Sequence, residues 1–199
     1  SSGMLLNRLS TSITPLLLSN FFGVTWLGYY AMANMALNIP VSILRKSLHT
    51  VFLQETSELK NKGKPVSRVL SRLTLYIFLG GIIPLAIITF YGPDLFSFIF
   101  GSQWEISGEI ASLIIFWLFF TIVAVPSDAL IPVLNLQKIF VVFQALLFVS
   151  RILLMFIIFE TFETAIPVIF GLAIHGSLFN IFLASYVLFR ARKIESINL

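Results

Sequence analysis

The sequence predicts an all-α protein that crosses a membrane several times, and its composition gives the first reason. Of its 199 residues, 58% are hydrophobic, 21 are phenylalanine and only 11% are charged, whereas charged residues make up about 25% of an ordinary soluble domain. The mean hydropathy is +0.97. A soluble fold of this length could not keep so much apolar surface from water. The second reason is the pattern, because the apolar residues form long runs without the alternation of barrel strands.

The apolar runs predict the individual helices. A helix that crosses a bilayer needs about 20 predominantly apolar residues, and the chain has about six runs of that length. We expect helices near residues 3–22, 26–53, 69–91, 107–130, 139–159 and 164–189. Together they form one membrane unit over residues 1–190, followed by a short basic cytoplasmic tail at residues 191–199.

The connectors between these runs alternate in charge. The basic side chains are Lys60, Lys62, Lys64, Arg68, Arg72, Lys138, Arg190, Arg192 and Lys193. The intervening connectors carry Asp94, Glu105, Glu109, Glu160 and Glu163. Since Lys and Arg accumulate in cytoplasmic loops, the alternation predicts a multi-pass protein with both termini in the cytoplasm. On the outer side we expect a short interfacial helix at Gly92–Trp104 and a belt of aromatic residues, namely Trp26, Tyr29, Tyr30, Tyr91 and Trp104.

Several function classes are disfavoured by the residues. The sequence pI is near 9.6, but the basic residues lie in membrane connectors, so we expect no nucleic-acid partner. Cysteine is absent, and no grouping of residues suggests a metal or another cofactor. No GxSxG, HExxH or glycine-rich phosphate loop occurs, which favours a transporter over an enzyme.

Polar residues recur at helical spacing inside the apolar runs. In the second run Asn34, Asn38, Arg45 and His49 share one face, because a helix turns 100° per residue. Charges within a bilayer are rare and usually functional, and here they are almost all positive. We therefore expect a cationic lumen that accepts an anionic substrate. The predicted lining residues are Arg8, Asn34, Asn38, Arg45, His49, Gln144 and Arg151.

Each of these residues also has a structural alternative. Arg8 and Lys46 could instead extend to the inner membrane surface. Arg45 and Arg151 lie deeper, so for them we favour the lumen or a pairing between helices over such an extension. For His49 the alternative is a satisfied interfacial histidine, and for His175 we favour helix packing over proton transfer. Asp128 is the one candidate carboxylate within the membrane, and we expect it to cap a helix or to partner an arginine.

Three segments resemble a known family. Gly28–Leu59, Gly92–Trp104 and Val125–Arg151 are similar to the C-terminal half of bacterial lipid-linked oligosaccharide flippases. These form the polysaccharide-transporter branch of the multidrug/oligosaccharidyl-lipid/polysaccharide exporter superfamily. The most specific feature is Phe-Gly-x-x-Trp after Gly-Pro-x-Leu-Phe, within "GPDLFSFIFGSQW".

The resemblance implies more than the residues alone. Such flippases consist of two six-helix lobes around a cationic cavity, in the bacterial inner membrane. They move polyprenyl-pyrophosphate-linked oligosaccharides, such as O-antigen units of lipopolysaccharide. Arg8 and Arg45 would then contact phosphate or acidic sugars. On this view the chain is a fragment, the C-terminal lobe alone, whose partners are membrane lipid, the anionic lipid-linked oligosaccharide, and a missing N-terminal lobe or a second copy.

Other functions stay open at this point. A drug/cation antiporter lobe of the same superfamily would need an acidic ion site in the membrane, for which only Asp128 is available. A polytopic membrane enzyme of polysaccharide assembly would normally have a catalytic acid/base pair or a large outer loop, and neither is evident. A subunit that assists assembly without transporting anything is the remaining possibility.

Overall fold

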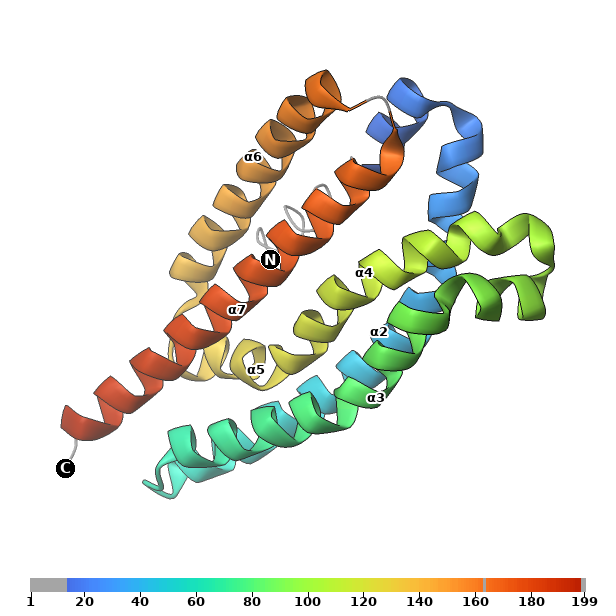
Figure 1. The fold of residues 1–199 in the computed structure, drawn as a ribbon. Helices are drawn as coiled ribbons and strands as arrows, with labels where there is room; N and C mark the ends of the chain where they lie inside the picture. Colours follow the sequence, from blue (N-terminus) through green and yellow to red (C-terminus); the bar gives the residue numbers. More distant parts are fainter. Residues whose placement is uncertain (1–13, 163, 198–199) are drawn as a thin grey trace.

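The computed structural model describes residues 14–162 and 164–197, and every element in that part of the chain is a helix. Residues 14–22 are helical. They are followed by α2 (Val24–Asn61), α3 (Val66–Phe100), the short 3-10 helix η1 (Ser102–Trp104), α4 (Glu105–Val123), α5 (Val125–Val133), α6 (Gln137–Thr161) and α7 (Ala165–Ile197) (Figure 1). The predicted all-α class is therefore confirmed.

Four helical segments are long and apolar enough to cross a membrane. They are Val66–Phe100, Ser102–Val133, Gln137–Phe159 and Ala165–Glu195, and they correspond to the last four of the six predicted spans. The second predicted span is a helix, α2, but it is not among the four because polar residues interrupt its apolar run. Most of the first predicted span lies in residues 1–13, outside the described part of the chain.

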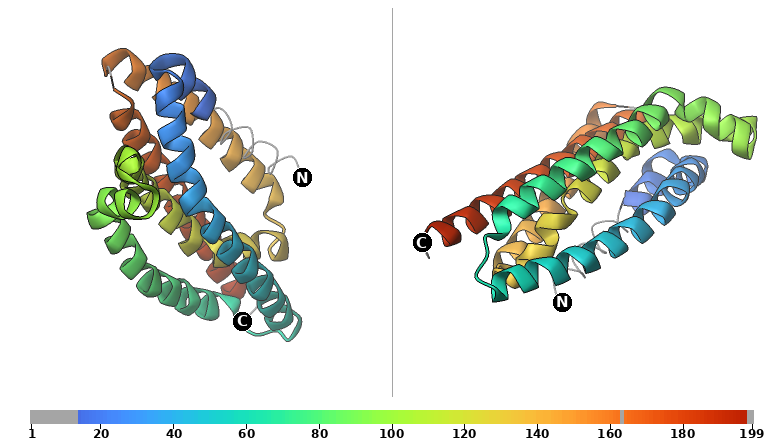
Figure 2. Two further views of the ribbon diagram at one scale, coloured as in Figure 1. Left: turned by 90° about the vertical axis from the view of Figure 1, so that its right-hand side faces the viewer. Right: turned by 90° about the horizontal axis from the view of Figure 1, so that it is seen from below.

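Helix α4 is the centre of the fold. It packs against α3, α2 and α7, while α6 runs beside α7 (Figures 1 and 2). In the most apolar 18-residue stretch of the Ser102–Val133 segment, 56% of the residues are buried. In the corresponding stretch of α3, no residue is buried. The main core contains Ile110, Ile114 and Leu118 of α4 with Leu37 of α2 and Ile169 of α7. Because α4 is so enclosed, the other helices are positioned largely by their contacts with it.

A pair of glycines brings α3 and α4 close together. A Cβ atom added to Gly108 would lie 2.3 Å from the carbonyl oxygen of Gly92, and one added to Gly92 would lie 2.6 Å from the carbonyl oxygen of Gly108. Only glycine leaves room for backbones at this separation. Helix α3 is bent (Figure 2, left), and Pro84 and Pro93, which each remove a backbone hydrogen bond, lie inside it.

The segment Gly92–Trp104 is not a separate interfacial helix. Residues up to Phe100 continue α3, and the chain then reverses at Gly101, whose φ of 103° favours glycine. The expectation rested on the length of the segment, which is too short to span a membrane by itself. Because most of this segment is the end of the longer helix α3, its own length does not determine whether it crosses the membrane.

The end of α7 is attached to the start of α3. Helix α7 continues to Ile197, so residues 191–197, which the sequence predicts to belong to a tail, are helical. Glu195 accepts hydrogen bonds from the backbone N–H groups of Val66 and Ser67, at 2.6 and 2.8 Å, and from the Ser67 hydroxyl at 2.5 Å. A carboxylate at the N-terminus of a helix satisfies donors that have no partner within the helix. Glu195 therefore fixes α7 to α3.

Replacing Glu195 with alanine is expected to lower the free energy of unfolding by about 0.5–2 kcal/mol, the usual effect of losing a helix cap. Glu58→Ala is the control, since Glu58 and Lys62 form an exposed pair at 3.4 Å, and such pairs contribute little. The measurement is thermal unfolding of the full chain in detergent. Equal melting temperatures for the two variants would show that the Glu195 contacts do not stabilise the fold.

Candidate functional site

Helix α2 carries a continuous face of polar side chains, which we call the α2 polar face: Asn34, Asn38, Ser42, Arg45 and His49. The two asparagine amides are hydrogen-bonded to each other, and the Ser42 hydroxyl donates to the carbonyl of Ile39 at 2.8 Å. Ser42 is exposed and the other four residues are partly buried. The predicted grouping of these side chains on one face of a helix is thus present, and the described helices leave that face partly open.

Arg45 is paired with an acidic residue of another helix. Its Nη2 atom donates to Oδ2 of Asp128, in α5, at 2.9 Å. The Asp128 side chain is 14% exposed and that of Arg45 is 41% exposed. Of the interpretations offered for Arg45, the structure therefore agrees with pairing between helices, because the fold brings α5 against α2. The alternative role of Asp128 as an arginine partner is confirmed.

Two other predicted cations behave differently. Lys46, the residue after Arg45, is exposed and makes no ion pair within the described part of the chain. Arg8 lies outside the described residues. Asp128 neutralises the charge of Arg45, and the charge of Lys46 is left over. This turn of α2 therefore keeps a net positive charge.

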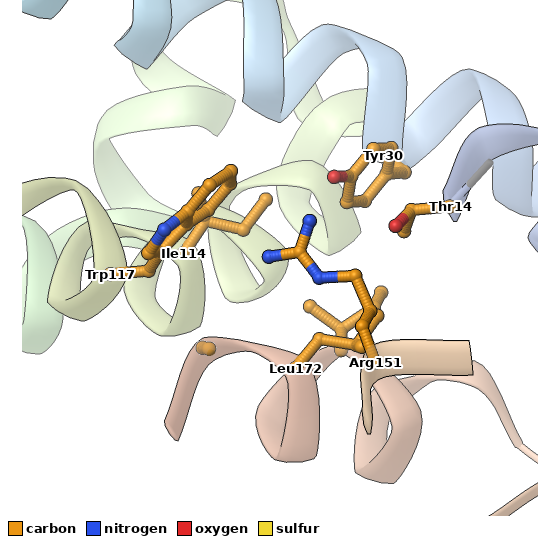
Figure 3. Close-up of a pocket in the computed structure, with 8 residues that line it drawn as sticks. Thr14, Tyr30, Ile114, Trp117, Arg151 and Leu172 are labelled. Atoms are coloured by element: carbon orange, nitrogen blue, oxygen red, sulfur yellow. The ribbon is translucent and has the colours of Figure 1, made fainter. Parts of the chain in front are cut away.

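Arg151 lies inside the helix bundle. It is 3% exposed, and its guanidinium carbon is 5.2 Å from the centre of the Trp117 ring, at the distance of a cation–π contact. Figure 3 shows the guanidinium between Trp117 of α4 and Tyr30 of α2, with Thr14 nearby. Between these side chains is a cavity of about 20 Å³, large enough for one water molecule. A sugar does not fit there.

In the part of the chain that the structure describes, Arg151 and the α2 polar face do not line a common cavity. The cavity at Arg151 includes none of the α2 polar face, and Gln144 is only 9% exposed. Of the two interpretations offered for Arg151, the geometry agrees with contacts between helices.

Several contacts of the interior were not anticipated. Tyr30 is 7% exposed and lines the cavity at Arg151, so its assignment to an outer aromatic belt is wrong. Trp117 gave no signal in the sequence beyond its apolar surroundings. His175 and Ser150 form a hydrogen bond at 2.8 Å between α7 and α6, which agrees with a packing role for this histidine. Among the described residues, no group of three or more His, Asp or Glu could hold a metal ion.

Comparison with known proteins identifies the family. A family model described as "polysaccharide biosynthesis protein" matches residues 2–109, just over half of the chain. The chain belongs to the polysaccharide biosynthesis protein family. The family region contains α2, α3 and the first turn of α4, and therefore the whole α2 polar face. Asp128 and Arg151 lie beyond it. No curated protein and no solved structure matches the chain.

Proposed function

We propose that the chain is the C-terminal lobe of a flippase that moves an anionic, polyprenyl-pyrophosphate-linked oligosaccharide across the bacterial inner membrane. Membership of a polysaccharide biosynthesis family supports a role in polysaccharide assembly or export. The four helices that could cross a membrane support a polytopic protein. A carrier lipid with a bulky polar head crosses a bilayer only very slowly unaided, because its polar groups would have to enter the hydrocarbon, and a polytopic protein could provide a polar path for them.

The observation that carries the proposal is the partly exposed α2 polar face. Amide and guanidinium groups that faced lipid would each cost several kcal/mol. The face therefore needs water or protein opposite it, which a second lobe would provide as the other wall of a lumen. That lobe is either an N-terminal half or a second copy of this chain. Amides suit sugar hydroxyls, and a guanidinium suits phosphate.

The proposal includes an orientation, with the basic loop between α2 and α3 in the cytoplasm and the turn between α3 and α4 outside. Lys62 and Ser102 are both exposed and lie at opposite ends of α3. A cysteine at position 62 is expected to react with a membrane-impermeant maleimide only in inverted vesicles. A cysteine at position 102 is expected to react in intact cells. The opposite labelling pattern would overturn the orientation.

The function itself is tested by deleting the gene that encodes this chain in its host. Loss of a flippase is expected to leave completed lipid-linked oligosaccharide inaccessible to a membrane-impermeant sugar-oxidising reagent in right-side-out spheroplasts. Re-expression of the gene should restore access. If the oligosaccharide is equally accessible with and without the gene, while the length or acylation of the polysaccharide changes, the protein is an enzyme of assembly and the proposal fails.

A further inference from the structure

Three arginines from two distant parts of the chain meet at one end of the molecule. Arg68 and Arg72 are one turn apart at the start of α3, and Arg192 is near the end of α7. All three side chains are exposed, and we call them the arginine cluster. They can come together because the end of α7 lies beside the start of α3 (Figure 2, right).

Two contacts set the position of Arg192 on α3. Its Nη2 atom donates to the hydroxyl of Ser71 at 3.4 Å, across 121 positions of sequence. Three residues further along α7, Glu195 accepts hydrogen bonds from the first backbone N–H groups of α3. Ser71 shares one face of α3 with Arg68 and Arg72, because a helix turns 100° per residue. The third arginine is therefore held at the same face as the other two.

The charge of the arginine cluster is not neutralised within residues 14–162 and 164–197. The ion pairs in that part of the chain are Arg45 with Asp128 and Lys62 with Glu58. The carboxylate of Glu195 is already hydrogen-bonded to the N-terminus of α3. Each guanidinium is a planar fork of donors that fits a phosphate group. Three of them on one exposed face are therefore suited to binding phosphate.

The arginine cluster lies at the edge of the apolar part of α3. No charged side chain occurs between Arg72 and Asp94, and at 1.5 Å per residue this stretch covers about 32 Å. The hydrocarbon core of a bilayer is about 30 Å thick. A membrane that covers this stretch therefore has Arg72 at its boundary and Arg68 one turn further out, in the layer that contains the phosphates of phospholipids.

Apolar side chains continue the same face of α3 into the membrane. Leu75, Leu79 and Ile83 are all exposed, and helical periodicity places them on the face that carries Arg68 and Arg72. This face thus has cations at its end and apolar side chains along its length. A phospholipid, with its phosphate joined to acyl chains, has the complementary arrangement.

We propose that the arginine cluster binds the phosphate of an anionic phospholipid, whose acyl chains lie along the exposed apolar face of α3. The accumulation of basic residues in cytoplasmic connectors accounts for their presence at this end of the chain. It does not account for hydrogen bonds that gather arginines of α3 and α7 on one face. No residue of the α2 polar face takes part, so the inference does not depend on transport.

The test is native mass spectrometry of the full chain in a mild detergent, titrated with dioleoyl phosphatidylglycerol or dioleoyl phosphatidylcholine. The first phosphatidylglycerol is expected to bind more tightly than phosphatidylcholine, which has no net charge. Arg68→Gln, Arg72→Gln and Arg192→Gln should each weaken its binding about fivefold, since one basic residue near a membrane surface contributes about 1 kcal/mol. The triple variant should bind both lipids alike.

Lys62→Gln is the matched control. It removes a positive charge from the same end of the molecule, but Lys62 is already paired with Glu58, so phosphatidylglycerol should bind as it does to the unsubstituted chain. The arginine variants are expected to fold, because Arg68 and Arg72 are exposed and their side chains make no hydrogen bond in the part of the chain that the structure describes.

Equal binding of the two lipids by the unsubstituted chain would overturn the proposal, and so would unchanged binding of phosphatidylglycerol by the triple variant. A loss in Lys62→Gln as large as that in Arg72→Gln would also overturn it, because diffuse charge would then explain the preference. Glycerophosphoglycerol, the headgroup without acyl chains, should not displace the lipid at the same concentration. If it does, the cluster binds free phosphate compounds and the lipid proposal fails.

Discussion

Replacing Arg45 with alanine is expected to lower the abundance of the protein more than replacing Arg45 and Asp128 together. The single change leaves the Asp128 carboxylate, only 14% exposed, without its partner. Breaking a fully buried pair in this way costs about 3–5 kcal/mol, and the loss here is smaller because the Arg45 side chain is 41% exposed. The double variant removes both charges and avoids the unpaired carboxylate. The measurement is the amount of folded protein in the membrane.

A neutral pair separates the structural role of Arg45 from its proposed contact with substrate. Arg45→Gln with Asp128→Asn keeps a hydrogen bond between α2 and α5 and removes both charges. We expect normal abundance and loss of surface polysaccharide, because an amide cannot replace a guanidinium at phosphate. Arg45→Lys should retain part of the activity. Full export by the neutral pair would show that Arg45 serves only to hold α2 against α5.

The second large effect is expected at the crossing of α3 and α4. Gly108→Ala places a Cβ atom 2.3 Å from the Gly92 carbonyl oxygen and 2.6 Å from the Pro93 Cα. These are backbone atoms, so the helices must separate. Overpacking of this kind typically costs about 1–3 kcal/mol or more, which exceeds the gain of about 1 kcal/mol from replacing glycine in a helix.

Gly80→Ala is the control for this prediction, since its added Cβ meets no atom within 4 Å. That variant should gain helix propensity and be as stable as the unsubstituted chain or more so. Both variants are compared by titration from a mild detergent into sodium dodecyl sulfate, with helix content as the signal. If Gly108→Ala unfolds at the same fraction of dodecyl sulfate as Gly80→Ala, the backbones at the crossing are farther apart than the structure indicates.

Local sequence patterns were sufficient for the class of fold and for most helix positions. The spans predicted at residues 107–130 and 139–159 fall within Ser102–Val133 and Gln137–Thr161. The length and hydropathy of an apolar run are enough to predict a spanning helix, because the thickness and apolar interior of a bilayer impose both. The α2 polar face was also predictable, since the periodicity of a helix determines which side chains share a face.

Contacts between distant segments could not be predicted in this way. Arg45 and Asp128 are 83 positions apart, and nothing in either segment specifies that α5 packs on α2. The same limit applies to Tyr30. Its position near the end of a predicted span suggested a place at the membrane interface, but tertiary packing buries its side chain.

The pairing of α2 with α5 has a consequence for the order in which the protein is assembled. During synthesis α2 leaves the ribosome well before Asp128, and α2 is not among the helices apolar enough to cross a membrane. An arginine at the centre of a membrane helix adds about 2.5–3.5 kcal/mol to the free energy of insertion. A newly made α2 therefore has a weak tendency to enter the bilayer until α5 supplies the opposite charge. Asp128 of α5 is therefore expected to assist the insertion of α2 only after both helices have been synthesised.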